Sequence, residues 1–332
     1  MAYAIETEKL SKTYKTEGKS IQALESLDLQ ISEGETFGFL GPNGAGKTTA
    51  IKLITGLITP TSGRVSVLGK EAGSPEAKKD MGYLSEVAYY YTFMEAEKLL
   101  RYYSSLKGIS GRDADKRIEE NLRLTGLYDR RKERLKGYSK GMQQRFGIAL
   151  ALMGNPRLLI LDEPTSGLDP IGRKEVKDII KTLKNKGITI FLSSHHLSEV
   201  ETVCDTIGVV NKGRTVCMKK LSEFLNYDKD VYTMRFKDND GKIAESLKGR
   251  ISSMRQEEDG TMRLTAPKND VPEIFGVITG AGGVVLDTIP GYGNLEETFF
   301  DLIVPKGKDG GKAEAEEPEA KKDDKKVDNE NE

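Results

Sequence analysis

The sequence contains little cysteine and no long hydrophobic run, and both absences limit the class of protein. Cys204 and Cys217 are the only cysteines in 332 residues, and no C-x-x-C or Cys–His spacing accompanies them. A disulfide framework and a cysteine-based metal site are therefore not predicted. The longest apolar candidate, "FGIALALMG", is about half of the roughly 20 residues that span a bilayer. The N-terminus also lacks the charged-then-apolar order of a secretion signal, so we expect a cytoplasmic protein.

An excess of charge of one sign is also missing. Lys and Arg number 51, Asp and Glu number 52, and the formal net charge is −1. No global field therefore points to nucleic acid or to an acidic membrane. Charged residues make up 31% and hydrophobic residues 37%, which is typical of a globular chain, and the length exceeds that of one ordinary domain.

The chain divides into regions of different texture. Residues 1–222 alternate short β-branched runs with helical patterns, as α/β domains do. The run "RLLILDE" is apolar at consecutive positions, which predicts a strand buried on both faces of a parallel sheet. Between "MGYLSE" and this run, residues of about 87–155 have little strand character, and we expect them to form a helical insert.

A second pattern follows the α/β region. Residues 225–304 alternate in the order β-α-β-β-α-β and end in one more helical segment, which predicts a small α+β, ferredoxin-like domain. Its role is open among regulation, dimerisation and partner contact. Residues 305–332 contain no aromatic residue and carry many charges of both signs, so we expect a disordered tail.

A glycine-rich loop carries the strongest functional signal. The stretch "GPNGAGKTT" fits G-x-x-x-x-G-K-[ST], with a strand pattern before it and a helical pattern after it. Glycines allow a tight turn around an anion, and successive N–H groups with the helix dipole favour phosphate. We expect Lys47 to reach the β- and γ-phosphates of a nucleoside triphosphate, Thr48 to ligate Mg²⁺, and Thr49 to lie nearer the α-phosphate. The predicted nucleotide-binding residues of this loop are Gly41, Pro42, Asn43, Gly44, Ala45, Gly46, Lys47, Thr48 and Thr49.

An acidic pair ends a predicted strand. Asp162 and Glu163 close the run "LLILDEP", and ligands of open parallel sheets bind beyond the carboxyl ends of strands. Asp162 is the predicted Mg²⁺ partner, directly or through water. Glu163 is the predicted base that polarises the attacking water.

The stretch "YSKGMQQRFGIALALMGNPRLLILDEPTSGLDP" resembles the ATP-binding cassette (ABC) ATPases, from the signature loop through Walker B to the D-loop. The resemblance covers residues 1 to about 220 in order. It is closest to the export-type branch, which includes drug, antibiotic, lipid and polysaccharide exporters whose ATPase subunit is separate from the membrane subunit. The implied fold is a P-loop NTPase cassette with a mostly parallel core sheet, a helical subdomain and an antiparallel β subdomain.

The resemblance assigns further site residues. Tyr14 matches the aromatic residue that stacks on adenine, although an ordinary strand aromatic would give the same sequence. Ser139 and Gly141 match two positions of the L-S-G-G-Q signature, and Asp169 matches the D-loop aspartate. His195, directly after the paired serines of "FLSSHH", matches the switch histidine that senses the γ-phosphate. His196 is the weaker candidate.

The sequence departs from the family pattern at two sites. Lys140 and Met142 replace a glycine and the glutamine of the signature. Lys140 either adds positive charge near the γ-phosphate or projects into solvent. Glu86 stands where the Q-loop glutamine is expected, and a carboxylate cannot donate a hydrogen bond as an amide does.

The resemblance implies a transport ATPase. Two cassettes, as a homodimer or heterodimer, would sandwich ATP head to tail, and a separate integral membrane permease would carry the substrate. The subunit would be peripheral on the inner face of the membrane, and the aromatic cluster "YYYTFME" would either face the permease or pack locally. The alternative is a soluble ABC ATPase that acts on ribosomes or DNA. Only 91 residues separate Lys47 from Ser139, which disfavours the coiled-coil chromosome type.

Overall fold

A six-stranded sheet forms the centre of the α/β region. In this computed structural model, residues 3–16, 18–224, 227–238, 243, 247, 251, 253–257 and 260–292 are described. The strand order is β10-β9-β3-β8-β7-β6, and all neighbours are parallel except β9 and β10. The strands are β3 (Thr36–Leu40), β6 (Met81–Leu84), β7 (Leu158–Leu161), β8 (Thr189–Ser194), β9 (Thr206–Asn211) and β10 (Arg214–Lys220).

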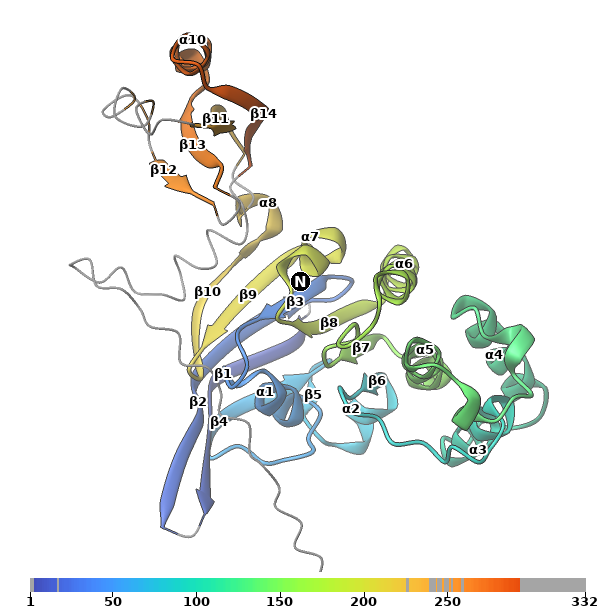
Figure 1. Cartoon of the computed structure of the whole chain (residues 1–332). Helices are drawn as coiled ribbons and strands as arrows, with labels where there is room; N and C mark the ends of the chain where they lie inside the picture. Colours follow the sequence, from blue (N-terminus) through green and yellow to red (C-terminus); the bar gives the residue numbers. More distant parts are fainter. Residues whose placement is uncertain are drawn as a thin grey trace, which may run out of the picture.

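The apolar runs in the sequence become the inner strands, because both faces of this sheet are covered. Every residue of β3, β7 and β8 is buried. Leu159 and Leu161 pack into a core with α5, α6 and α7, whereas Leu158 and Ile160 pack into a second core with α1 (Figure 1). The helices of these layers are α1 (Lys47–Ile54), α2 (Pro75–Lys79), α5 (Lys140–Ala151), α6 (Pro170–Asn185) and α7 (Leu197–Val203).

An antiparallel sheet lies against the α1 side of the centre. Its order is β2-β1-β4-β5, and its inward residues Ile5, Leu29 and Val67 join the core that contains Ile51 of α1. The strands are β1 (Tyr3–Thr16), β2 (Lys19–Ser32), β4 (Ser62–Val67) and β5 (Lys70–Glu71). The second sheet thereby holds the helix that follows the glycine-rich loop.

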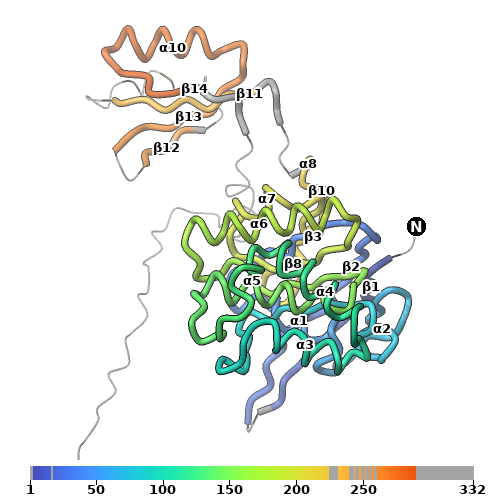
Figure 2. Tube along the Cα trace, turned by 90° about the vertical axis from the view of Figure 1, so that its right-hand side faces the viewer, coloured from blue at the N-terminus to red at the C-terminus, as the bar shows by residue number. Residues whose placement is uncertain are grey.

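A helical segment lies between β6 and β7 in the chain, and its helices are grouped together in Figure 2. This segment has a core of its own. Apolar positions at helical spacing, including Leu99, Leu122 and Phe146, meet in this core. The segment consists of α3 (Ala96–Leu106), α4 (Gly111–Leu124), the 3₁₀ turns η1 (Tyr128–Arg130), η2 (Leu135–Gly137) and η3 (Leu152–Gly154), and α5. Only the isolated bridge between Glu95 and Arg134 pairs as β structure within its described residues.

The C-terminal region forms a third sheet, in the order β12-β13-β11-β14, with all neighbours antiparallel. Met234, Leu264 and Ile274 are buried in its core. Its elements, with the short helix that precedes them, are α8 (Leu221–Phe224), β11 (Tyr227–Lys237), β12 (Ser253–Gln256), β13 (Met262–Pro267), η4 (Lys268–Asp270), α10 (Val271–Gly280) and β14 (Val284–Tyr292). The strand order fits the expected β-α-β-β-α-β unit, but the ferredoxin-like assignment stays a prediction.

The α/β cassette architecture predicted from the sequence is confirmed, with its mostly parallel core, helical insert and antiparallel sheet. The domain boundaries at 1–222, 225–304 and 305–332 stay predictions. Most of the helix expected at 241–249, the helix expected at 295–304 and the charged tail lie outside the described residues. Among the residues that are described, no helix combines the length and the apolar character that crossing a membrane requires.

Candidate nucleotide-binding site

The glycine-rich loop joins β3 to α1 in a tight turn. Gly46 has φ 105° and precedes the first residue of α1, and a Cβ there would lie 2.6 Å from the carbonyl oxygen of Ala23. A Cβ on Gly41 would lie 2.4 Å from the carbonyl oxygen of Val210. Neither position therefore admits a side chain, and the loop backbone lines the space in front of α1.

Lys47 is buried and its ammonium is fully engaged. Nζ donates to the carbonyl oxygens of Gly41 at 2.7 Å and Pro42 at 3.3 Å, and lies 3.2 Å from Oε1 of Glu163. The structure thus brings the predicted lysine of the loop into contact with the predicted base. An anionic phosphate at this position would meet a cation that is already oriented by the loop.

Asp162 lies at the end of β7 with 1% of its surface exposed. Its Oδ1 accepts a hydrogen bond from Oγ of Ser193 at 2.7 Å, and the Thr48 hydroxyl also hydrogen-bonds to its carboxylate. Burial, with the nearby charges of Glu86 and Glu163, raises the pKa of Asp162 above its usual value, and the two hydroxyl hydrogen bonds oppose this rise.

Glu163 adopts a left-handed backbone conformation, with φ 46°. Its N–H donates to Oγ of Ser193 at 2.9 Å, and the same hydroxyl donates to Asp162. The buried side chain then contacts Lys47 through Oε1 and Nδ1 of His195 through Oε2, the latter at 2.6 Å. Glu163 is therefore held between the cation of the loop and the predicted switch histidine.

His195, and not His196, contacts the predicted base. The ring of His195 lies beyond the end of β8 and is partly exposed, with 34% of its side chain accessible. The ring of His196 lies 4.0 Å from that of His195, and its backbone caps α7. This geometry favours His195 as the switch residue, as the sequence predicts.

Lys47 and Glu163 line one cavity, and Asp162 and His195 are not among its lining residues. Its volume is about 380 Å³. The lining residues are Ala23, Pro42, Asn43, Gly44, Ala45, Gly46, Lys47, Thr48, Thr49, Glu86 and Glu163. Glu86, which follows β6, is one of the residues that line this cavity. Tyr14 does not line it, and its half-buried ring on β1 lies 5.4 Å from Nζ of Lys12.

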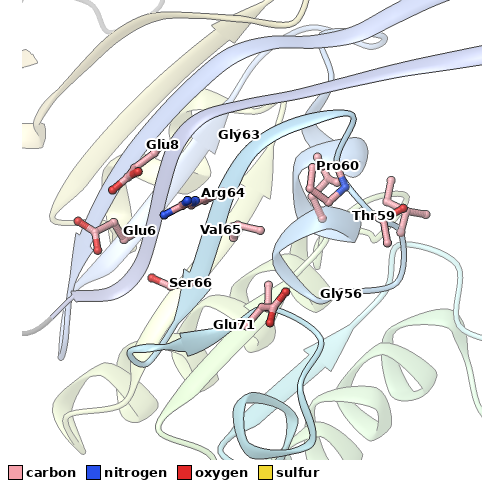
Figure 3. A pocket seen from close by; sticks show the side chains of 13 residues that line it. Glu6, Glu8, Gly56, Thr59, Pro60, Gly63, Arg64, Val65, Ser66 and Glu71 are labelled. Atoms are coloured by element: carbon pink, nitrogen blue, oxygen red, sulfur yellow. The ribbon is translucent and has the colours of Figure 1, made fainter.

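A second cavity, of about 480 Å³, lies beyond the C-terminal end of α1 (Figure 3). Glu6 and Glu8 of β1, Arg64 of β4 and Leu53 of α1 are among its lining residues. It contains none of the predicted site residues. Although it is larger, the phosphate chemistry belongs to the smaller cavity, because that one holds the loop N–H groups and Lys47.

Within one chain, the predicted signature and D-loop residues do not line the cavity that contains Lys47. Ser139 is exposed and caps α5, its Oγ accepting from the N–H of Met142 at 3.3 Å. Asp169 is exposed and caps α6, its Oδ1 accepting from the N–H of Gly172 at 2.8 Å. The exposed Lys140 lies against the D-loop, since a Cβ on Gly167 would be 2.1 Å from its Nζ.

Comparison with known proteins assigns the family. The sequence profile of the ABC transporter family matches residues 24–166. An uncharacterised ABC transporter ATP-binding protein of Synechocystis is 41% identical over 263 residues, which are 78% of this chain and 73% of that protein. The chain belongs to the ABC transporter ATP-binding proteins. It is accordingly an ATP-binding, ATP-hydrolysing subunit linked to a transporter, as the sequence predicts.

Two further comparisons describe relatives of this ABC ATPase. The bacitracin transport ATP-binding protein BcrA of Bacillus licheniformis is 34% identical and aligns over 91% of this chain and 98% of its own. The dimeric post-hydrolysis structure of the ATP-binding cassette MJ0796, bound to ADP and Pi, is 27% identical, with a TM-score of 0.60 over 65% of this chain and 98% of that chain.

Sequence reasoning missed several polar residues of the ABC ATPase site. Ser193 donates a hydrogen bond to Asp162 and accepts one from the backbone N–H of Glu163. Nothing in the sequence distinguishes it beyond its place before the histidine. Thr165, Ser194 and Glu199 form a further buried group. Serine, threonine and glutamate are common residue types, so only their meeting in the fold distinguishes them.

Proposed function

We propose that this ABC ATPase is the energy-supplying subunit of an exporter, and that it works with a separate membrane permease as a pair of cassettes that hold ATP between them. The division of the site supports pairing. Lys47 and Glu163 line one cavity and Glu163 contacts His195, whereas Ser139 and Asp169 stand exposed at helix starts elsewhere. A second cassette, placed head to tail, would bring its Ser139 to this chain's ATP, and the solved relative MJ0796 is a dimer.

We assign the chemistry of hydrolysis to three residues. The loop N–H groups and Lys47 bind the β- and γ-phosphates. The Glu163 carboxylate accepts the proton of the attacking water and orients it. His195 is held by Glu163 at 2.6 Å, at the end of β8 where it can donate to a γ-phosphate oxygen. Hydrolysis would then remove the shared phosphate and loosen the pair.

The residues at the end of β7 suit a magnesium ion. The Thr48 hydroxyl and the Asp162 carboxylate lie within hydrogen-bonding contact, and both offer the oxygen ligands that Mg²⁺ prefers. Mg²⁺ sites of this kind use one or two protein groups with water and phosphate. The ion would neutralise phosphate charge while Thr48 and Asp162 hold it.

A row of neighbouring aromatic rings ends at a cavity that could receive a segment of the permease. The ring centroid of Tyr91 lies 6.0 Å from that of Phe93 and 6.5 Å from that of Tyr102. Tyr102 in turn lies 5.5 Å from Tyr103, which lines a cavity of about 280 Å³ with Leu57. Phe93 and Leu57 are 67% and 57% exposed, and aromatic residues are enriched at protein interfaces. We place the permease contact here and the subunit at the inner face of the membrane.

The permease contact predicts a loss of membrane recruitment in Leu57→Asp. A charge in an apolar contact costs about 1–3 kcal/mol without a partner, so the affinity of the complex should fall about 5- to 150-fold. The tagged chain is isolated with its permease from the membranes of its source, and the amount of permease retained is measured. Val216→Asp, at an exposed position of β10, is the matched control. Equal retention in the two variants would refute this docking face.

A further inference from the structure

A carboxylate lies buried behind the catalytic loops and belongs to none of the assigned motifs. Glu199, on α7, has 6% of its surface exposed. Its Oε2 accepts hydrogen bonds from Oγ1 of Thr165 and, at 3.1 Å, from Oγ of Ser194. Thr165 and Ser194 are themselves buried, with 4% and 3% exposed. The three side chains therefore form a closed group inside the protein.

The two hydroxyl donors come from the two loops that carry catalysis. Thr165 follows Glu163 by two residues and begins the turn to the D-loop, with the N–H of Leu168 donating to its carbonyl oxygen at 3.2 Å. Ser194 is the last residue of β8 and directly precedes His195. Its Oγ also accepts from the N–H of His196 at 2.9 Å, so Ser194 fixes the peptide on the far side of His195 as well.

The group holds a carboxylate without a counter-cation. No Lys, Arg or His side chain within the described part of the chain forms an ion pair with Glu199. Burial of a carboxylate is costly unless hydrogen bonds compensate it. Hydroxyl groups supply them to Oε2 of Glu199, whereas its buried Oε1 has no hydrogen-bond partner within the described residues. An apolar residue at this position would be the less costly way to fill α7. The polar group therefore does more than fill space: its acceptor oxygen joins the Glu163 loop to the His195 loop.

We propose that Glu199 is a positioning residue for ATP hydrolysis. Its Oε2, shared between Thr165 and Ser194, holds the two loops in register so that Glu163 and His195 stay at hydrogen-bonding distance. Glu199 touches neither nucleotide nor reacting water and acts only through these hydroxyls. The inference rests on the proposed roles of Glu163 and His195, and it adds a buried element that couples the D-loop to the switch histidine.

The test compares two substitutions of similar volume. Glu199→Gln keeps a carbonyl oxygen that accepts from both hydroxyls, whereas Glu199→Leu removes every acceptor. Because small displacements of catalytic groups can cost about 100-fold in rate, Glu199→Leu should lower kcat about 10- to 100-fold. Its KM for ATP should stay within about threefold, since the loop around Lys47 is untouched. Glu199→Gln should recover most of the lost kcat.

A second route tests the same hydrogen bonds from the donor side. Thr165→Val should lower kcat as Glu199→Leu does, and the double variant should be no worse than the more impaired single variant, because both remove one shared interaction. Thr125→Val is the matched control: this buried threonine donates to Asn121 in the helical segment and contacts neither loop. Thermal unfolding of every variant is followed in parallel, and the donor-side variant decides the question should Glu199→Leu not fold.

Three results would overturn the inference. The first is a near wild-type kcat in both Glu199→Leu and Thr165→Val. The second is a loss of kcat in Glu199→Gln as large as that in Glu199→Leu. The third is a fall in kcat that is explained by loss of folded protein and is equally large in Thr125→Val. Glu163→Gln, run beside them, separates this from the proposed function. If Glu163→Gln abolishes turnover while Glu199→Leu does not, only the positioning role fails.

Discussion

At the residue scale, Glu163 combines an unusual backbone conformation with two buried polar contacts. A left-handed conformation costs a non-glycine residue about 1–2 kcal/mol. The φ angle of Glu163 is 46°, and the hydrogen bond from its N–H to Oγ of Ser193 helps to hold this conformation. The side chain is thereby directed between Lys47 and His195. Backbone strain at a site that also concentrates charge is typical of catalytic positions.

Alanine substitutions of the two adjacent histidines should affect ATP turnover differently. His195→Ala removes the imidazole that contacts Glu163, and loss of a proton-handling group typically costs 10²–10⁴-fold, so turnover should fall about 100-fold or more with ATP affinity largely kept. His196→Ala should retain near wild-type turnover, because the His196 ring packs against His195 but its side chain makes no hydrogen bond or ion pair with Glu163 or Lys47 among the described residues. Steady-state ATPase assays and nucleotide titrations check both. A normal rate in His195→Ala would move the switch role to His196.

The site residues that the sequence could predict are those that belong to motifs with fixed spacing. Lys47, Asp162 and Glu163 could be assigned because phosphate chemistry requires those residue types at fixed places around a strand and a loop. Ser193 and Glu199 could not, since Ser193 lies 30 residues from Glu163 and Glu199 lies 34 residues from Thr165 along the chain. Which hydroxyl contacts which carboxylate depends on the order and register of the strands in the sheet.

At the element scale, the apolar runs predicted the inner strands because both faces of the sheet are packed. β7 lies within the run "RLLILDE", and β3 is the strand predicted before the glycine-rich loop. The edge strand β10 was not expected, because its exposed and half-buried residues alternate and its end is basic. The strand order could not be predicted from periodicity, which gives no lateral neighbours.

Close packing of the signature helix against β6 makes a separate prediction. A Cβ on Gly82 would lie 2.5 Å from the carbonyl oxygen of Ala151, at the end of α5, and backbone cannot move aside as a side chain can. Gly82→Ala should therefore lower the free energy of unfolding by about 1–3 kcal/mol. Urea denaturation measures this. Gly137→Ala, where a Cβ meets nothing within 4 Å, is the control. Equal stability of the two variants would contradict the packing argument.

At the scale of the whole molecule, the proposed function requires a pair of cassettes to complete the site. Ser139 and Asp169 engage the first turns of their own helices in one chain, and neither lines the nucleotide cavity. Sequence alone indicated this arrangement only through the family resemblance, because no pattern within one chain specifies a symmetric partner. The role of the C-terminal sheet stays a prediction at this scale.

The most direct measurement is the mass of Glu163→Gln in solution with Mg²⁺ and ATP. This substitution keeps the binding loop and removes the base, so the nucleotide should stay intact between two cassettes. The account predicts about twice the monomer mass by light scattering with ATP, the monomer mass with ADP, and the monomer mass for Lys47→Ala under both conditions. A Glu163→Gln protein that stays monomeric with ATP while hydrolysing it at the wild-type rate would contradict the account.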